Sequence, residues 1–93
     1  FGKPIGSFQL VQKKLAEMLT AITQAQLLCW RLGTLKMTGK ASTAQISMAK
    51  RANVAMALDV AREARQILGG MGITGDFPIL RHLMNLESVV TYE

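Results

Sequence analysis

Apolar residues recur every three or four positions from Phe8 to Met37, and this long periodic stretch restricts the chain to few folds. The apolar positions are Leu10, Val11, Leu15, Met18, Leu19, Ile22 and Ala25. The spacing is typical of one face of an α-helix, and Ser7 can cap its N-terminus. A helix of this length extends for roughly 45 Å at 1.5 Å per residue. It therefore predicts an elongated helical bundle and not a compact globule.

Two further stretches have helical spacing. Ser42 or Thr43 can cap a helix that runs to about Leu68, and residues 76–78 can start a third helix that continues to Glu93. Aromatic residues make up only 5% of the chain, which favours helices over strands. Because the connections are short, neighbouring helices are expected to be antiparallel. The sequence thus predicts an all-α fold, an antiparallel up-down helical bundle.

The second helix should bury an alanine-rich stripe. The expected inward positions are Ile46, Ala49, Ala52 or Val54, Met56, Val60, Ala64 and Ile67 or Leu68, and the alanines of the stripe also include Ala55, Ala57 and Ala61. Small residues let helices pack closely. Three helices of unequal length leave a groove that a fourth helix would fill.

The last five residues are VVTYE, an acid directly after an apolar run. A natural C-terminus is more often a frayed polar tail. We therefore expect this chain to be part of a longer protein.

The formal net charge is +5, but the basic residues are scattered and do not alternate with aromatics. We expect a solvated basic face and no nucleic-acid partner; the alternative is a face that meets an anionic cofactor or partner. With one cysteine, Cys29, no intrachain disulfide can form, and we expect Cys29 to be a small buried hydrophobe. One Cys and one His make a metal site improbable. No segment reaches the ~20 apolar residues that a membrane span needs.

Three glycines occur within four residues at Gly69-Gly70-Met71-Gly72. A helix C-cap with a tight turn explains one glycine well and three poorly. The others are expected where a ligand or another chain approaches the backbone closely.

Three stretches, in this order and at these separations, resemble the C-terminal helical domain of flavin-dependent acyl-CoA dehydrogenases. They are FGKPI at 1–5 with FQ at 8–9 and LAEM at 15–18, QILGGMG at 66–72, and TYE at 91–93. The resemblance covers residues 1–93 and implies three helices of a four-helix domain, with the fourth helix missing.

A narrower resemblance lies in residues 79–87 and 91–93, and in residues 12–16 near the start of the chain. Many acyl-CoA dehydrogenases have an Arg-Asp pair where this chain has Met84-Asn85, whereas the pattern here is similar to glutaryl-CoA dehydrogenases. That resemblance implies FAD-dependent oxidation and decarboxylation of glutaryl-CoA to crotonyl-CoA and carbon dioxide. Two alternatives remain: a dehydrogenase of another short or branched acyl-CoA, and a non-catalytic helical oligomerisation module.

The resemblance also implies roles for the C-terminal residues. Glu93 matches the catalytic base, which takes the α-proton of the acyl thioester while a hydride leaves the β-carbon for the flavin. Such a base needs a dry site that raises its pKa, which the neighbouring Val89 and Val90 could help to supply. Tyr92 would lie beside the acyl group. From the residues alone, Glu93 is simply an exposed terminal acid and Tyr92 a buried aromatic.

The family resemblance implies that other residues of the chain bind FAD. Phe8 and Gln9 match a pair that contacts the cofactor, and Phe1 matches an aromatic near its adenine end; for Phe8, a core aromatic is the alternative. The segment that meets the FAD of a neighbouring subunit consists of Gln66, Ile67, Leu68, Gly69 and Gly70. The family's phosphate-binding arginine, just before Phe1, is absent from this chain.

Further implications concern assembly and location. The resemblance implies a homotetramer and an electron-transfer flavoprotein as electron acceptor. It also implies the mitochondrial matrix in a eukaryote or the cytoplasm in a bacterium.

Overall fold

The computed structural model describes residues 1–92, and the predicted base Glu93 lies outside the described residues. Three α-helices dominate the structure: α1 (Gln9–Met37), α2 (Thr43–Leu68) and α3 (Ile79–Tyr92). Two short 3-10 helices, η1 (Ile5–Ser7) and η2 (Gly69–Ile73), precede α1 and follow α2. The described part of the chain contains no strand, which confirms the all-α prediction.

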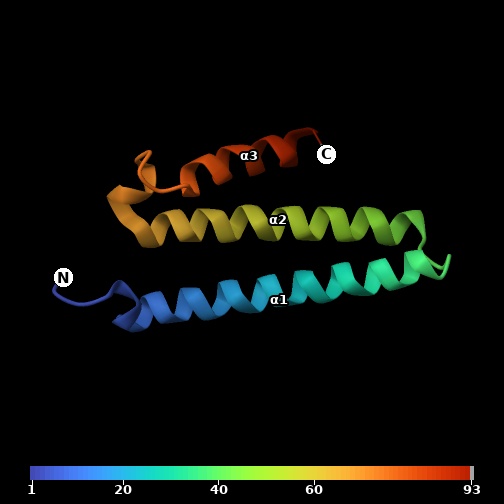
Figure 1. The fold of residues 1–93 in the computed structure, drawn as a ribbon, viewed down its shortest axis with the longest axis horizontal. Helices are drawn as coiled ribbons and strands as arrows, with labels where there is room; N and C mark the ends of the chain where they lie inside the picture. The colour runs from blue at the N-terminus through green and yellow to red at the C-terminus, as the bar shows by residue number, and fades with distance from the viewer. Residues whose placement is uncertain (93) are drawn as a thin grey trace.

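The helices form a single layer with α2 in the middle (Figure 1). α1 and α3 pack antiparallel to α2 on its two sides, and not closely on each other. The principal extents are 55 × 27 × 15 Å, so the thinnest dimension is little more than the ~10–12 Å diameter of one helix. The up-down order is therefore confirmed, but the helices do not close around a common core.

A capping box fixes the beginning of α2. The Ser42 hydroxyl accepts a hydrogen bond from the Gln45 backbone N–H at 3.2 Å, and the Ser42 N–H donates to Gln45 Oε1 at 2.8 Å. These two bonds satisfy N–H groups that have no partner inside the helix. The predicted start at Ser42 or Thr43 is confirmed.

The predicted cap of the first helix is wrong. Phe8, not Ser7, is the N-cap residue of α1, and it makes no side-chain capping bond. Ser7 belongs to η1, where its hydroxyl donates to the Pro4 carbonyl oxygen at 2.7 Å. The hydroxyl is therefore used in the turn that Pro4 starts and does not serve the helix.

The buried apolar residues of the described chain all lie on α2: Ala49, Leu58 and Ala61. The predicted stripe contained Ala49 and Ala61 but missed Leu58, and it included Ile46 and Ala52, which are exposed. The reason is the middle position of α2. A helix with a neighbour on each side buries residues in two directions, whereas a single stripe assumes one direction.

The prediction of a buried Cys29 is also wrong. Cys29 is exposed, and Asn53 Nδ2 donates a hydrogen bond to its sulfur at 2.9 Å. Because α1 has only one neighbouring helix, a residue at the edge of the α1–α2 contact keeps its access to solvent. This polar contact joins the middle of α1 to α2.

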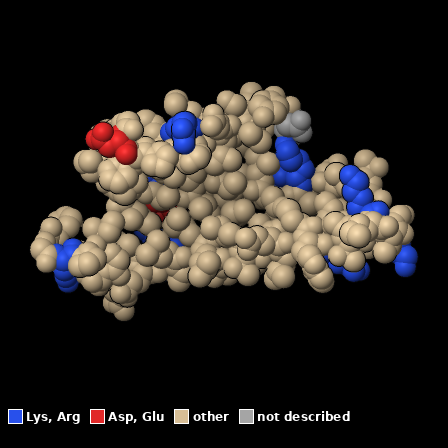
Figure 2. Space-filling model, viewed as in Figure 1, with Lys and Arg blue, Asp and Glu red and all other residues tan. Residues whose placement is uncertain are grey.

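The surface shows no large charged patch on the face drawn in Figure 2, where basic side chains are separated by uncharged surface. Within residues 1–92, no helix is long and apolar enough to cross a membrane.

Candidate functional site

The predicted site residues fall into two groups at the two ends of α3 (Figure 1). One group combines the N-terminal segment with the end of α2, and the other is the C-terminal end of α3. The helix between them has 14 residues, about 21 Å at 1.5 Å per residue. The two groups therefore do not surround one common pocket in a single chain.

Phe8 is the structured centre of the N-terminal segment. Its backbone is extended, and its half-buried ring lies 5.7 Å from that of Phe1 in an edge-to-face arrangement. Phe1 is fully exposed, and Gln9, the first residue of α1, is exposed too. Phe1 and Gln9 are thus open to a ligand, whereas Phe8 also has partners within the chain.

Two residues that sequence reasoning missed hold this segment in place. The Lys3 ammonium lies 4.4 Å from the centre of the Phe8 ring, a cation–π contact. Gln12 Nε2 donates to the Gly6 carbonyl oxygen at 3.0 Å. Both contacts depend on the turn of η1, which brings residues distant by five or six positions together, so no spacing rule in the sequence reveals them.

The last turn of α2 contains both packed and exposed candidates. Ile67 and Leu68 are half-buried and line an apolar groove of about 340 Å³ together with Leu15 and Met18 of α1. Gln66 is exposed. The side chains of Ile67 and Leu68 therefore serve packing, while the Gln66 amide is available for hydrogen bonding.

Gly69, Gly70 and Gly72 differ in whether the fold requires a glycine at their position. Gly69 has φ +60°, a conformation that other residues rarely adopt. Gly72 is buried, and a Cβ there would lie 2.4 Å from the Arg65 carbonyl oxygen. Gly70 has neither constraint, because a Cβ there would meet nothing within 4 Å. Packing within the chain does not explain Gly70, whose exposed backbone is open to a partner or ligand.

The second group lies where α3 ends. Tyr92 is the last residue of α3 and its side chain is exposed. Val89 is half-buried, and Val90 lines a pocket of about 530 Å³ against the N-terminal half of α2. The pocket exists because α3, with 14 residues, covers only part of the 26-residue α2.

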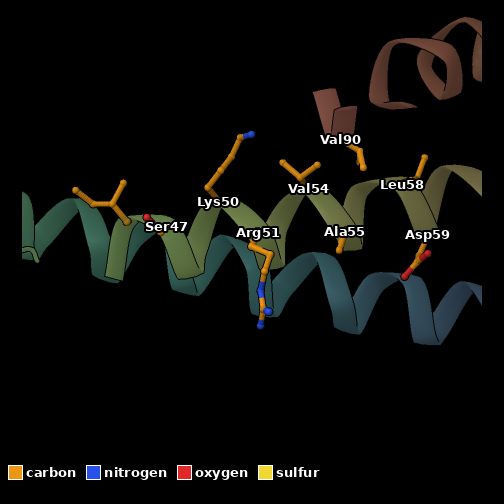
Figure 3. A pocket seen from close by; sticks show the side chains of 9 residues that line it. Ser47, Lys50, Arg51, Val54, Ala55, Leu58, Asp59 and Val90 are labelled. Atoms are coloured by element: carbon orange, nitrogen blue, oxygen red, sulfur yellow. The ribbon is translucent and has the colours of Figure 1, made fainter. Parts of the chain in front are cut away.

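This pocket has an apolar wall and charged residues beside it (Figure 3). Val54 and Leu58 of α2 point to the side of α3, where Val90 approaches them. Lys50 points to the same side, whereas Arg51 extends to the side of α1. The end of α3 thus lies over a partly apolar surface with a basic side chain nearby, a setting that suits an anionic or thioester group.

The described residues contain no group of three His, Cys, Asp or Glu side chains that could hold a metal ion. The groups suited to a larger cofactor are the exposed amides of Gln9 and Gln66, the open backbone at Gly70 and the exposed Phe1 ring. Amides and free backbone can hydrogen-bond a dinucleotide, and an aromatic face can stack on its base. The first group therefore fits a dinucleotide cofactor.

Comparison with known proteins gives a consistent result. The chain is 40% identical over 93 residues to the mitochondrial short-chain specific acyl-CoA dehydrogenase of Bos taurus. It is 48% identical, with a TM-score of 0.94 and 99% of the chain covered, to a crystal structure of glutaryl-CoA dehydrogenase from Mycobacterium smegmatis. A second structure from M. smegmatis, a glutaryl-CoA dehydrogenase in complex with FADH2, matches 99% of the chain with 46% identity and a TM-score of 0.93.

The chain spans about a quarter of the length of these relatives, 23% of the bovine protein and 24% of each mycobacterial chain. The family model of the acyl-CoA dehydrogenase C-terminal domain matches residues 1–93. The chain belongs to the acyl-CoA dehydrogenase family and corresponds to its C-terminal domain.

Proposed function

We propose that this chain is part of an FAD-dependent glutaryl-CoA dehydrogenase, which oxidises and decarboxylates glutaryl-CoA to crotonyl-CoA and carbon dioxide. The observation that carries the proposal is the 48% identity to a glutaryl-CoA dehydrogenase over 99% of the chain. The identity to the bovine short-chain enzyme is lower, at 40%. The Met84-Asn85 pair in α3 agrees with this choice of substrate.

In this proposal Glu93 takes the proton from the α-carbon of the acyl thioester. Tyr92 lies beside the acyl group, and Val89 and Val90 help to exclude water, which favours proton transfer to a carboxylate. FAD, when bound, supplies the acceptor for the hydride of the β-carbon. Loss of carbon dioxide from the resulting unsaturated acyl-CoA leaves a dienolate, and addition of a proton to its γ-carbon gives crotonyl-CoA.

The first group of residues would bind FAD, with Gln66 to Gly70 meeting the FAD of a neighbouring subunit. Gln9 and Gln66 offer amides, Gly69 and Gly70 offer backbone, and Phe1 offers a ring; Phe8 holds Phe1, while Ile67 and Leu68 anchor the segment by packing. These residues lie at the other end of α3 from Tyr92, ~21 Å away. A single copy would then contribute to two active sites, which fits the proposed homotetramer.

The proposal includes the remaining parts of the reaction cycle. An electron-transfer flavoprotein would accept the electrons from the reduced enzyme. The compartment would be the mitochondrial matrix in a eukaryote, as in the name of the bovine relative, or the cytoplasm in a bacterium.

The test compares two substrates in the complete flavoprotein that carries this chain. Glutaryl-CoA should reduce the flavin and release carbon dioxide, and butyryl-CoA should be a poor substrate. The Glu93→Gln variant should retain flavin and lose turnover. Undiminished turnover in that variant would refute the role of Glu93.

A second candidate is a dehydrogenase of a short monocarboxylic acyl-CoA, favoured by the 40% identity to the bovine short-chain enzyme. It predicts the reverse preference, with butyryl-CoA turned over and no carbon dioxide released. The substrate comparison therefore separates the two enzymes.

A third candidate is a non-catalytic helical oligomerisation module. Large exposed apolar residues favour it, including Leu19, Leu27 and Trp30 on α1. It predicts a stable oligomer without flavin in the purified protein. Since the proposed enzyme is itself oligomeric, only the flavin content discriminates between them.

A further inference from the structure

Two ion pairs connect the three helices through consecutive residues of α2. Arg62 Nη2 lies 2.5 Å from Glu87 Oε1 of α3, and Glu63 Oε2 lies 2.9 Å from Lys14 Nζ of α1. We call these four residues the charge ladder. All four side chains are about half exposed.

The ladder lies on one face of the helical layer. Consecutive residues of an α-helix point about 100° apart. α1 and α3 flank α2 on opposite sides, yet neighbouring residues of α2 reach both of them. Both side chains must therefore lean towards the same broad face of the layer, where the charges form a row across the three helices.

Apolar packing alone specifies the position of α3 along α2 weakly. The C-terminal half of α2 contains Ala57, Ala61 and Ala64, whose short side chains form low ridges. η2 packs on α2 through the buried Gly72, and residues 74–78 between η2 and α3 form no helix, so apolar contacts of α3 itself must set its position. A directional polar pair can set a register that non-directional apolar contacts leave open.

We propose that Arg62 and Glu87 are positioning residues that fix α3 along α2 and thereby place its C-terminal end. Glu87 lies five residues before Tyr92 on the same helix, so a shift of α3 moves Tyr92 with it. The inference rests on the proposed function, because it matters only if the end of α3 meets the substrate. Lys14 pairs with Glu63 and so joins α1, not α3, to α2, which makes Lys14 a control for the loss of an ion pair elsewhere on α2.

The test uses the complete flavoprotein and measures flavin reduction per bound flavin after rapid mixing with saturating glutaryl-CoA. The variants are Arg62→Gln, Glu87→Gln, the reversed pair Arg62→Glu with Glu87→Arg, and Lys14→Gln as the control. The two single variants should reduce flavin about two- to fivefold more slowly, the range expected for an exposed pair. In these variants the kinetic isotope effect on flavin reduction by α-deuterated glutaryl-CoA should rise. Their KM for glutaryl-CoA and their flavin content should stay unchanged.

The reversed pair should recover most of the lost rate, and Lys14→Gln should match the parent protein. Rates equal to the parent in both single variants would overturn the inference, as would a reversed pair no faster than the single variants. An equal loss in Lys14→Gln would also overturn it, because general destabilisation would then explain the effect. If neither glutaryl-CoA nor butyryl-CoA reduces the parent protein, the proposed function itself fails, a result that the parent alone reveals.

Discussion

The glycines after α2 show how one residue type can serve different purposes within four positions. Gly69 adopts a positive φ, Gly72 packs against the Arg65 backbone, and Gly70 does neither. The sequence indicated that three glycines are too many for one helix end. It could not assign a purpose to each, because backbone angles and close approaches exist only in the folded chain.

Substitution of two of these glycines should change stability to different extents. Gly72→Ala places a methyl group against the Arg65 carbonyl oxygen, and overpacking of this kind costs about 1–3 kcal/mol. Gly70→Ala is the matched control, with open space around the new atom and an expected change within about 0.5 kcal/mol. Chemical unfolding of the complete protein measures both, and equal midpoints for the two variants would contradict the packing argument.

Gly70 should matter for the cofactor instead. A bulky side chain, as in Gly70→Leu, should leave the unfolding midpoint close to that of the parent but weaken flavin retention. The physical reason is that the side chain fills the space through which FAD approaches the backbone. The flavin-to-protein ratio after gel filtration measures the effect, and unchanged retention would count against a flavin contact at this residue.

The helices themselves were largely predictable, because their signals are local. Periodic apolar residues located α1 and α2, and Ser42 with Gln45 marked the start of α2. Ser7 failed as a cap because the turn at Pro4 takes its hydroxyl. Leu58 was missed because the sequence does not reveal that α2 lies between two neighbours.

The capping box gives a prediction for α2 as a unit. Ser42→Ala removes the acceptor for the Gln45 N–H and should cost about 1 kcal/mol of unfolding free energy. Ser42→Asp keeps an acceptor at the same place and should retain most of the stability. A thermal or denaturant unfolding series checks both, and a Ser42→Ala variant as stable as the parent would show that the cap contributes nothing.

The molecule as a whole is a thin layer with very little interior. The buried apolar residues in positions 1–92 are two alanines and one leucine, whereas Trp30 is 70% exposed and Met37 91% exposed. Several large exposed apolar residues lie on α1, among them Leu10, Leu19 and Leu27, and exposed apolar surface of this kind indicates an interaction surface. The candidate site is open as well, because its two groups of residues lie at the two ends of α3 and this chain encloses neither group.

The isolated segment of residues 1–93 should therefore have low stability and aggregate when it is produced without the rest of the protein. We expect it to keep helical circular dichroism but to melt over a broad temperature range and to self-associate, since so little apolar surface is buried. Circular dichroism melting and sedimentation measure these properties. A sharp, concentration-independent transition of a monomer would contradict this prediction.

The visible absorption spectrum of the complete purified protein, before and after glutaryl-CoA is added, is the measurement to make first. We expect a bound-flavin band that bleaches when glutaryl-CoA is added, with the two groups of residues at the ends of α3 serving flavin and substrate. A protein without flavin would contradict the proposed enzyme and favour the helical oligomerisation module, and a flavin band that glutaryl-CoA does not bleach would contradict the proposed substrate.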